Sequence, residues 1–269
     1  MRPLTSSSKQ TMNPEDLNDL KRAKETLENV SLAARVTNLI GAPLEKGFER
    51  LPGSVRDKVG RITQTALMTA MKTVLLSMKD APDTAKSNRL HKLAAATSGG
   101  VGGAFGFTGL AAELPISTTI ILRSIADVAR SEGESIYKLE SRIACMEVFA
   151  LGSPQNKGDD AVETGYFAVR MALAEAVSSA AQQIAKKGIT SGNNAAIIRM
   201  IQLIAQRFSI QVSEKVAAQA IPAIGAAGGA LINTVFIDHF QQMAHGHFTI
   251  RRLERKYGRG EIRDAYHNA

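Results

Sequence analysis

Two apolar stretches of the sequence contain a few polar residues that could form a binding or catalytic site. Arg123 and Asp127 are four residues apart, which places them on one helical face, and Glu113 precedes them. One interpretation is an intrahelical ion pair worth roughly 0.3 kcal/mol. The other is a polar cluster inside an apolar cavity, where Glu113 pairs with Arg123 because buried charges need partners. The candidate cluster comprises Glu113, Arg123, Asp127, Asn233 and Asp238.

The region richest in histidine is a candidate metal site. Asp238 and His239 are followed by His245 and His247. His245 and His247 flank a glycine and lack the i, i+4 spacing of the helical zinc motif, so we expect no metal and no cofactor. Cys145 lies in an apolar Ile-Ala-Cys-Met context, which predicts a buried, unreactive thiol. The G-x-S-x-G motif of a nucleophile elbow does not occur in the sequence.

The last predicted helix contains a dense group of basic residues. Arg251, Arg255 and Arg259 recur every four residues and therefore share one helical face. Such a face is often simply solvated, but it also suits an anionic membrane surface, where each basic group adds about 1 kcal/mol. Nucleic acid is not an expected partner, because few aromatic residues stand between the basic ones to stack on bases. The residues assigned to membrane binding, here called the basic stripe, are Arg251, Arg252, Arg255 and Lys256.

The composition limits the class of protein. The chain has 269 residues, of which 44% are hydrophobic, and a mean hydropathy of −0.07; these values exclude a polytopic membrane protein and a wholly disordered chain. The net charge of +8 suits phosphate-bearing partners. The single cysteine excludes an intramolecular disulfide and fits a reducing cytoplasm. The first residues lack the apolar core of a secretory signal and are expected to form a short disordered tail.

Helical periodicity dominates the chain, and strand-like alternation does not extend beyond about five residues. Asn13-Pro14-Glu15-Asp16 is typical of a helix start. The sequence therefore predicts an all-α fold, a compact single-domain multi-helix bundle. The expected organisation is a tail at 1–13, a helical domain at 14–260 and a C-terminal tail at 261–269. Amphipathic helical stretches are expected at about 14–40, 55–80, 116–131, 134–150, 160–187, 193–215 and 248–257.

Two Gly/Ala-rich stretches, 94–122 and 216–237, are expected to be central helical segments packed against each other. Small residues four apart let a second backbone approach closely. Because Gly inside a helix costs about 1 kcal/mol relative to Ala, these residues need a compensating role. Tight packing in a soluble core and a hairpin that dips into a bilayer both remain open, whereas no Walker or dinucleotide motif is present. Pro115 and Pro222 are expected to break the two stretches, which argues against spanning helices.

Three segments resemble the bacterial EcsC family, named after the third product of an ABC-transporter operon. They are GFTGLAAELPISTTIILRSIADVARSEGE (106–134), IPAIGAAGGALINTVFIDHF (221–240) and HFTIRRLERKYG (247–258). The most specific parts are the Glu-Leu-Pro…Arg-Ser-Ile pattern and the closing Arg-Arg-Leu-Glu-Arg block, and the likeness runs from about residue 60 to the end of the chain. The resemblance implies a helical bacterial protein, cytoplasmic or membrane-associated, with no settled catalytic activity.

These features predict a non-enzymatic, peripheral membrane protein that binds lipid or acts as a scaffold at the inner face of the cell membrane, with membrane proteins as further partners. Binding is expected to be reversible and led by charge, with Phe105 and Phe107 as shallow anchors. Replacing the basic stripe with Gln is then expected to reduce vesicle binding without unfolding the domain. The alternative is a hydrolase with a buried polar site around Glu113, Arg123 and Asp238. Glu113→Ala distinguishes the two, because lost turnover in a folded protein supports the hydrolase and destabilisation supports a structural ion pair.

Overall fold

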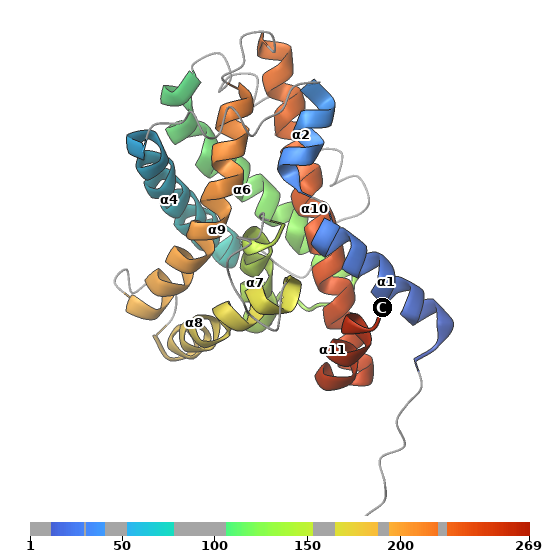
Figure 1. Cartoon of the computed structure of the whole chain (residues 1–269). Coiled ribbons are helices and arrows are strands. Elements are labelled where there is room, and N and C mark those ends of the chain that lie inside the picture. The colour runs from blue at the N-terminus through green and yellow to red at the C-terminus, as the bar shows by residue number, and fades with distance from the viewer. Residues whose placement is uncertain are drawn as a thin grey trace, which may run out of the picture.

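All regular secondary structure in the described residues of this computed structural model is helical, which confirms the all-α prediction (Figure 1). The structure describes residues 12–29, 31–40, 53–77, 106–152, 165–187, 194–219 and 225–269. The α-helices are α1 (Pro14–Asn29), α2 (Leu32–Ile40), α4 (Gly53–Ser77), α6 (Gly106–Ser131), α7 (Leu139–Glu147), α8 (Tyr166–Lys187), α9 (Ala195–Gln219), α10 (Gly225–Tyr257) and α11 (Arg259–His267). A 3₁₀ turn, η1 (Val148–Ala150), directly follows α7.

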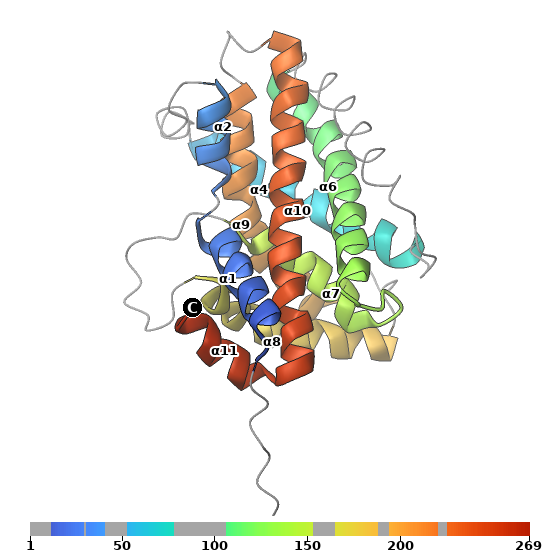
Figure 2. The same ribbon diagram turned by 90° about the vertical axis from the view of Figure 1, so that its right-hand side faces the viewer.

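Helix α10 is the axis of the bundle. Its 33 residues extend over roughly 50 Å, and Figure 2 shows it running the height of the molecule. It contacts α1, α2, α6, α9, α11 and η1. The helix expected at 248–257 is thus only the last part of a much longer element. The C-terminal tail expected at 261–269 is wrong, because α11 continues to His267 and buries Ile262 and Tyr266.

The first helices follow local signals in the sequence. The Asn13 side chain accepts a hydrogen bond from the Asp16 amide at 2.7 Å, so Asn13 caps α1 as expected. A second helix start follows soon after, because the Ser31 hydroxyl accepts a hydrogen bond from the Ala34 amide at 3.1 Å. The single amphipathic stretch expected over 14–40 is therefore two helices, α1 and α2.

Helix α6 runs through Pro115 without interruption, contrary to the expected break. Proline lacks an amide donor and crowds the preceding turn, which costs about 3 kcal/mol in a helix interior. Tertiary packing offsets this cost, since Leu114 is fully buried and α6 packs along both α4 and α10. The Pro115 carbonyl also accepts a hydrogen bond from the Thr119 hydroxyl at 2.8 Å. Pro222 and the stretch 94–105 lie outside the described residues.

An aromatic cluster joins η1, α9 and α10 in the core. Neighbouring rings have centroids 4.8 to 6.0 Å apart, and all are fully buried. The rings belong to Phe149, Phe208, Phe236 and Phe240. Directly after η1, Gly152 has a φ of +71°, and a Cβ atom there would lie 2.6 Å from Nε2 of His239. This turn therefore requires glycine, and it brings the end of η1 against α10.

Helix α1 crosses α10 at Gly246, where the missing side chain permits a close approach. A Cβ atom on Gly246 would lie 2.8 Å from Cγ of Leu27, which is itself buried. This separation is shorter than van der Waals contact, so any larger residue at the crossing would push α1 away from α10.

Gly246→Ala is expected to lower the free energy of unfolding by about 1 kcal/mol, because overpacking against Leu27 outweighs the gain in helix propensity. Gly60→Ala in α4 is the matched control, since nothing lies within 4 Å of a Cβ atom at Gly60. The control is expected to raise the free energy of unfolding by about 0.5–1 kcal/mol. Urea denaturation measures both values, and an equal gain for the two variants would contradict the close crossing.

Candidate functional site

A buried ion pair joins three helices of the bundle. The Nζ atom of Lys215 on α9 donates hydrogen bonds to Oε1 of Glu113 on α6 at 2.6 Å and to Oδ1 of Asn233 on α10 at 2.9 Å. Lys215 and Asn233 are fully buried, and Glu113 is 5% exposed. The two helices that continue the Gly/Ala-rich stretches, α6 and α10, thus meet through a lysine from a third helix. We call Glu113, Lys215 and Asn233 the buried cluster.

The environment of Lys215 explains why it needs both partners. Burial lowers the pKa of Lys215, and the carboxylate of Glu113 acts against this shift. The ammonium group also lies 4.9 Å from the ring centroid of Phe236, a cation–π contact. Removing one member of such a pair leaves the other charge buried and unpaired, which costs about 3–5 kcal/mol. The buried cluster therefore fixes how α6, α9 and α10 lie relative to one another.

Two of the five predicted polar residues, Glu113 and Asn233, come together in the buried cluster. The predicted pairing of Glu113 with Arg123 is wrong. Arg123 is exposed, and it lies ten residues further along α6, a rise of about 15 Å. Lys215 takes the place of Arg123 and was not predicted from the sequence. A signal was present, since Lys215 is the last charged residue before the uncharged run 216–237.

The other two predicted residues lie elsewhere. Asp127 pairs with Arg130, one turn further along α6. Asp238 lies on α10 but is not a hydrogen-bond partner of Lys215. Because Arg123 is on the exposed side of α6, the three residues of the alternative hydrolase site do not converge.

Two open polar grooves flank α9, and no residue of the buried cluster lines either of them. The groove between α4 and α9 has a volume of about 560 Å³, and the groove between α8 and α9 has a volume of about 410 Å³. Their walls include Arg, Gln and Ser side chains. The structural role of the buried cluster rests on its burial and on its contacts across three helices.

The residue before Lys215 is a second buried ionisable group. Glu214 is 5% exposed, and its Oε2 atom is buried with no hydrogen-bond donor in the described part of the chain. Burial raises the pKa of this carboxyl group to about 7. The folded chain therefore holds a proton at Glu214 under conditions in which the unfolded chain releases it, and stability depends on pH.

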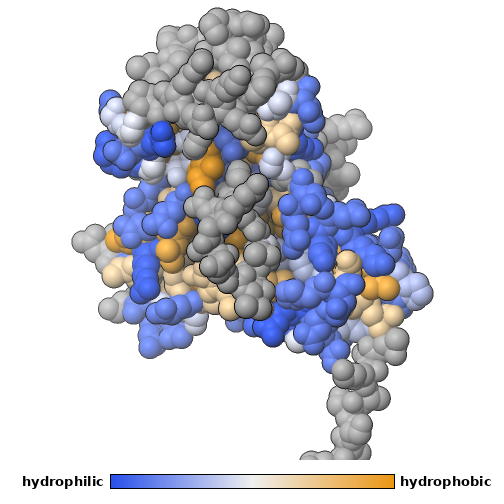
Figure 3. Space-filling model, in the orientation of Figure 1, coloured by the Kyte–Doolittle hydropathy of each residue, from blue (hydrophilic) through white to orange (hydrophobic). Residues whose placement is uncertain are grey.

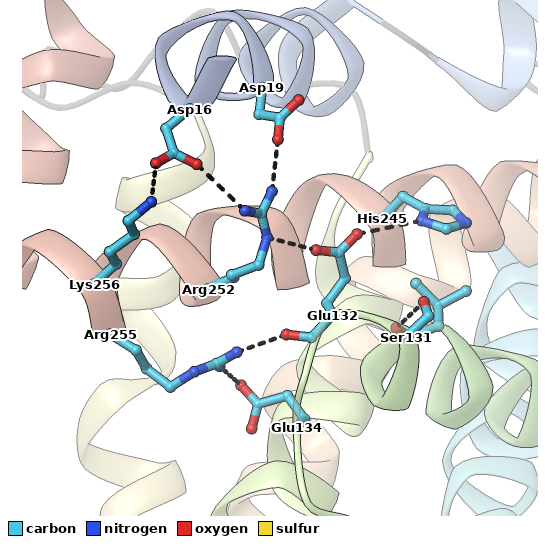
Figure 4. Close-up of polar contacts among 10 residues, drawn as sticks. Asp16, Asp19, Ser131, Glu132, Glu134, His245, Arg252, Arg255 and Lys256 are labelled. Carbon is cyan, nitrogen blue, oxygen red and sulfur yellow. Dashed lines mark hydrogen bonds and ion pairs between the residues drawn. The ribbon is translucent and has the colours of Figure 1, made fainter. Parts of the chain in front are cut away.

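A network of ion pairs links α1, the turn after α6 and the C-terminal part of α10 (Figure 4). Arg252 lies at its centre. It donates to Asp19 at 2.7 Å, to Glu132 at 2.9 Å and to Asp16 at 3.4 Å. Lys256 donates to the other carboxylate oxygen of Asp16 at 2.5 Å, and this hydrogen bond lowers the pKa of Asp16.

The remaining residues of the basic stripe are paired as well. Arg251 donates to Glu134 at 2.9 Å, while Arg255 pairs with Glu134 and donates to the Glu132 carbonyl at 2.6 Å. The basic stripe is therefore ion-paired, not a freely solvated face, and it ends where the chain turns at Gly258, whose φ is +97°. Replacing the stripe with Gln would remove contacts that hold α1 and the turn after α6, contrary to the expectation of no effect on folding.

The two buried histidines of α10 are hydrogen-bond partners in the core. The Nδ1 atom of His247 lies 2.9 Å from the Tyr166 hydroxyl, and the Nε2 atom of His239 lies 3.2 Å from the side-chain amide of Gln211. Burial lowers the pKa of both histidines, so both rings are neutral at pH 7. Across the residues that the structure describes, no group of three or more His, Cys, Asp or Glu side chains could hold a metal ion.

The sequence also led to expectations for Cys145, Phe105 and Phe107. Cys145 is buried and free, and burial raises the pKa of its thiol. The expected burial of this thiol is confirmed, and a buried thiol with a raised pKa favours the expected lack of reactivity. The expected membrane anchor Phe105 lies outside the described residues, and Phe107 lies in the first turn of α6, where the structure describes only the backbone.

Lys215→Met is expected to lower the free energy of unfolding by about 3–5 kcal/mol, because it leaves the Glu113 carboxylate buried without a counter-charge. Adding Glu113→Gln removes that charge and is expected to recover part of the loss. Arg123→Met, an exposed change of the same type on α6, is the control and is expected to shift stability by at most about 0.5 kcal/mol. Chemical denaturation compares the variants, and similar effects of Lys215→Met and Arg123→Met would rule out the structural role.

Glu214→Gln is expected to stabilise the protein at and above pH 7 and to have little effect below pH 4.5. The unfolded carboxyl group ionises near pH 4.5 and the folded one near pH 7, so wild-type stability falls as the pH rises through this window. Above this window the free energy of unfolding of Glu214→Gln is expected to exceed that of the wild type by roughly 3 kcal/mol. Urea denaturation on both sides of the window measures it, and parallel pH profiles for the two proteins would show that Glu214 ionises normally in the fold.

The fold and the buried cluster lie within a region that matches a known family. The model of the EcsC protein family matches residues 15–253, from the first turn of α1 through most of α10. The match includes every residue of the buried cluster and begins well before residue 60, where the resemblance was expected to start. No curated protein and no solved structure is significantly similar to the chain. The family match covers most of the 269 residues, and the chain therefore belongs to the EcsC protein family.

Proposed function

We propose that this protein is a non-enzymatic, membrane-associated protein that contacts lipid through the N-terminal halves of α6 and α10 and serves as a lipid-binding or scaffolding module. The exposure of two large apolar side chains carries the proposal. Ile116 on α6 is 55% exposed, and Leu231 on α10 is 48% exposed. The two helices pack against each other and begin at the same end of the molecule (Figures 1 and 2). We call Ile116, Leu231 and the turns that carry them the apolar end.

Large exposed apolar side chains are uncommon among the described residues. The face seen in Figure 3 is mostly hydrophilic, with smaller apolar patches between the polar side chains. Of the five exposed large hydrophobic side chains in the described residues, two lie on the neighbouring helices α6 and α10. The others lie on α1, in the turn after α6 and on α8; they are Leu17, Tyr137 and Met171.

The composition of α6 supports contact with a bilayer. Between Gly109 and Ser131 it is long and apolar enough to cross a membrane, with a mean hydropathy of 1.2, and among the described helices only α6 meets this criterion. The core helix of a water-soluble protein can meet it too, and 56% of the apolar window is buried inside the bundle. The burial favours contact with the membrane surface over a span across it.

The attachment is weak and reversible. Full burial of a Leu or Ile side chain contributes about 1.5–3 kcal/mol, so two half-exposed side chains together supply about the same 1.5–3 kcal/mol. Within this proposal the protein is peripheral and lies at the inner face of the cell membrane.

Replacing Ile116 and Leu231 with Glu is expected to reduce binding to phosphatidylcholine vesicles by about tenfold or more, because both apolar contacts are lost and two charges are added. Replacing Tyr137 and Met171 with Glu adds the same charge at side chains that are 63% and 60% exposed, and this control is expected to bind like the wild type. Vesicle flotation measures binding, and circular dichroism checks that each variant is folded.

Two results would refute the proposal. One is the absence of wild-type binding to the vesicles. The other is an equal loss of binding in the control variant, which would show that added negative charge, not the apolar end, sets the affinity.

A further inference from the structure

The basic stripe supports an inference beyond the apolar end, because a separate helix covers it. We propose that α1 is an acidic strap that masks a second membrane-binding surface, in which the basic stripe binds an anionic lipid bilayer. This inference rests on the proposed membrane association, and it adds to that association a contact that depends on charge and on the position of α1.

Helix α1 supplies half of the carboxylates that neutralise the basic stripe. Asp16 lies 2.5 Å from Nζ of Lys256 and 3.4 Å from Arg252, and Asp19 lies 2.7 Å from Arg252 (Figure 4). The turn after α6 supplies the other two carboxylates, Glu132 and Glu134. Four carboxylates therefore balance four basic side chains, and two positive charges are left over when α1 is absent from the stripe.

Helix α1 lies at the outside of the bundle, and its inward side chains pack against the hydrophobic core (Figure 2). It packs on α10 and α11 and buries one apolar stripe, formed by Leu20, Ala23 and Leu27 (Figure 2). The pairs α4–α6, α4–α9, α6–α10 and α9–α10 pack together without it. The interface with α10 is extensive, since Leu20 is fully buried and Ala23 and Leu27 are nearly so. Release of α1 breaks this one interface and its ion pairs, and it is a local event because the other helices keep their packing.

The basic stripe has the form that an anionic bilayer requires. Even with α1 in place, the side chains of Arg255 and Lys256 are 43% and 45% exposed. The four basic residues occupy two successive turns of one helix, so they present an array of charges to several headgroups at once, not a pocket for one phosphate. Such a surface competes with Asp16 and Asp19 for the same partners, and salt weakens its attraction.

Asp16→Asn combined with Asp19→Asn tests the strap, and Glu15→Gln combined with Glu25→Gln is the matched control. Both double variants change α1 and raise the net charge by the same amount, but Glu15 and Glu25 are exposed and form no ion pair with another described residue. The first variant is expected to bind vesicles that contain phosphatidylglycerol about tenfold more tightly than the control at low salt, and to lose this gain at high salt. On vesicles of phosphatidylcholine alone, the two are expected to bind equally.

Adding Arg252→Gln and Lys256→Gln to the first variant separates unmasking from misfolding. These changes remove the uncovered charges and are expected to abolish the gain on anionic vesicles. Equal binding of the first variant and its control to anionic vesicles, or a gain that survives the loss of Arg252 and Lys256, overturns the inference. Neither result bears on the apolar end, whose test uses phosphatidylcholine vesicles.

Discussion

The ammonium group of Lys215 constrains the rest of the structure, because a charge without access to water must find its partners within the protein. Those partners come from α6 and α10, so α6, α9 and α10 must converge at one level of the bundle. The Gly/Ala-rich stretches offer few large side chains that could set this level by shape. A directional contact with Glu113 and Asn233 sets it instead, while the aromatic cluster fills the space between α9 and α10.

Helix α10 uses polar contacts in two different ways along its length. Near its start, Asn233 is fully buried, so water cannot replace its bond from Lys215 if that bond is lost. Near its end, Arg255 and Lys256 are partly exposed, so water, salt or another anion can replace their carboxylate partners. The buried contact is therefore permanent in the folded state, whereas the basic stripe can exchange partners. This difference is why a regulated contact is proposed for the second region.

Local sequence signals predicted much of the fold. The features that they did not predict depend on tertiary packing. The cap at Asn13 and the burial of Cys145 follow from neighbouring residues, so the sequence was sufficient for both. Pro115 breaks a helix by local rules, and only the packing of α6 between α4 and α10 overrides them. The partner of Glu113 could not be predicted, because Lys215 is 102 residues away in the sequence and its approach depends on how α6 and α9 are rotated.

Part of the basic stripe lies on the same side of α10 as Leu231. An ideal helix turns 100° per residue, so Lys256, which follows Leu231 by 25 residues, lies within roughly 20° of the same side and about 37 Å along the axis. Helix α1 crosses α10 at Gly246, between these two residues. In the two proposals taken together, the apolar end contacts lipid while α1 is docked. Release of α1 would then uncover Arg252 and Lys256, so that charged attachment adds to apolar attachment.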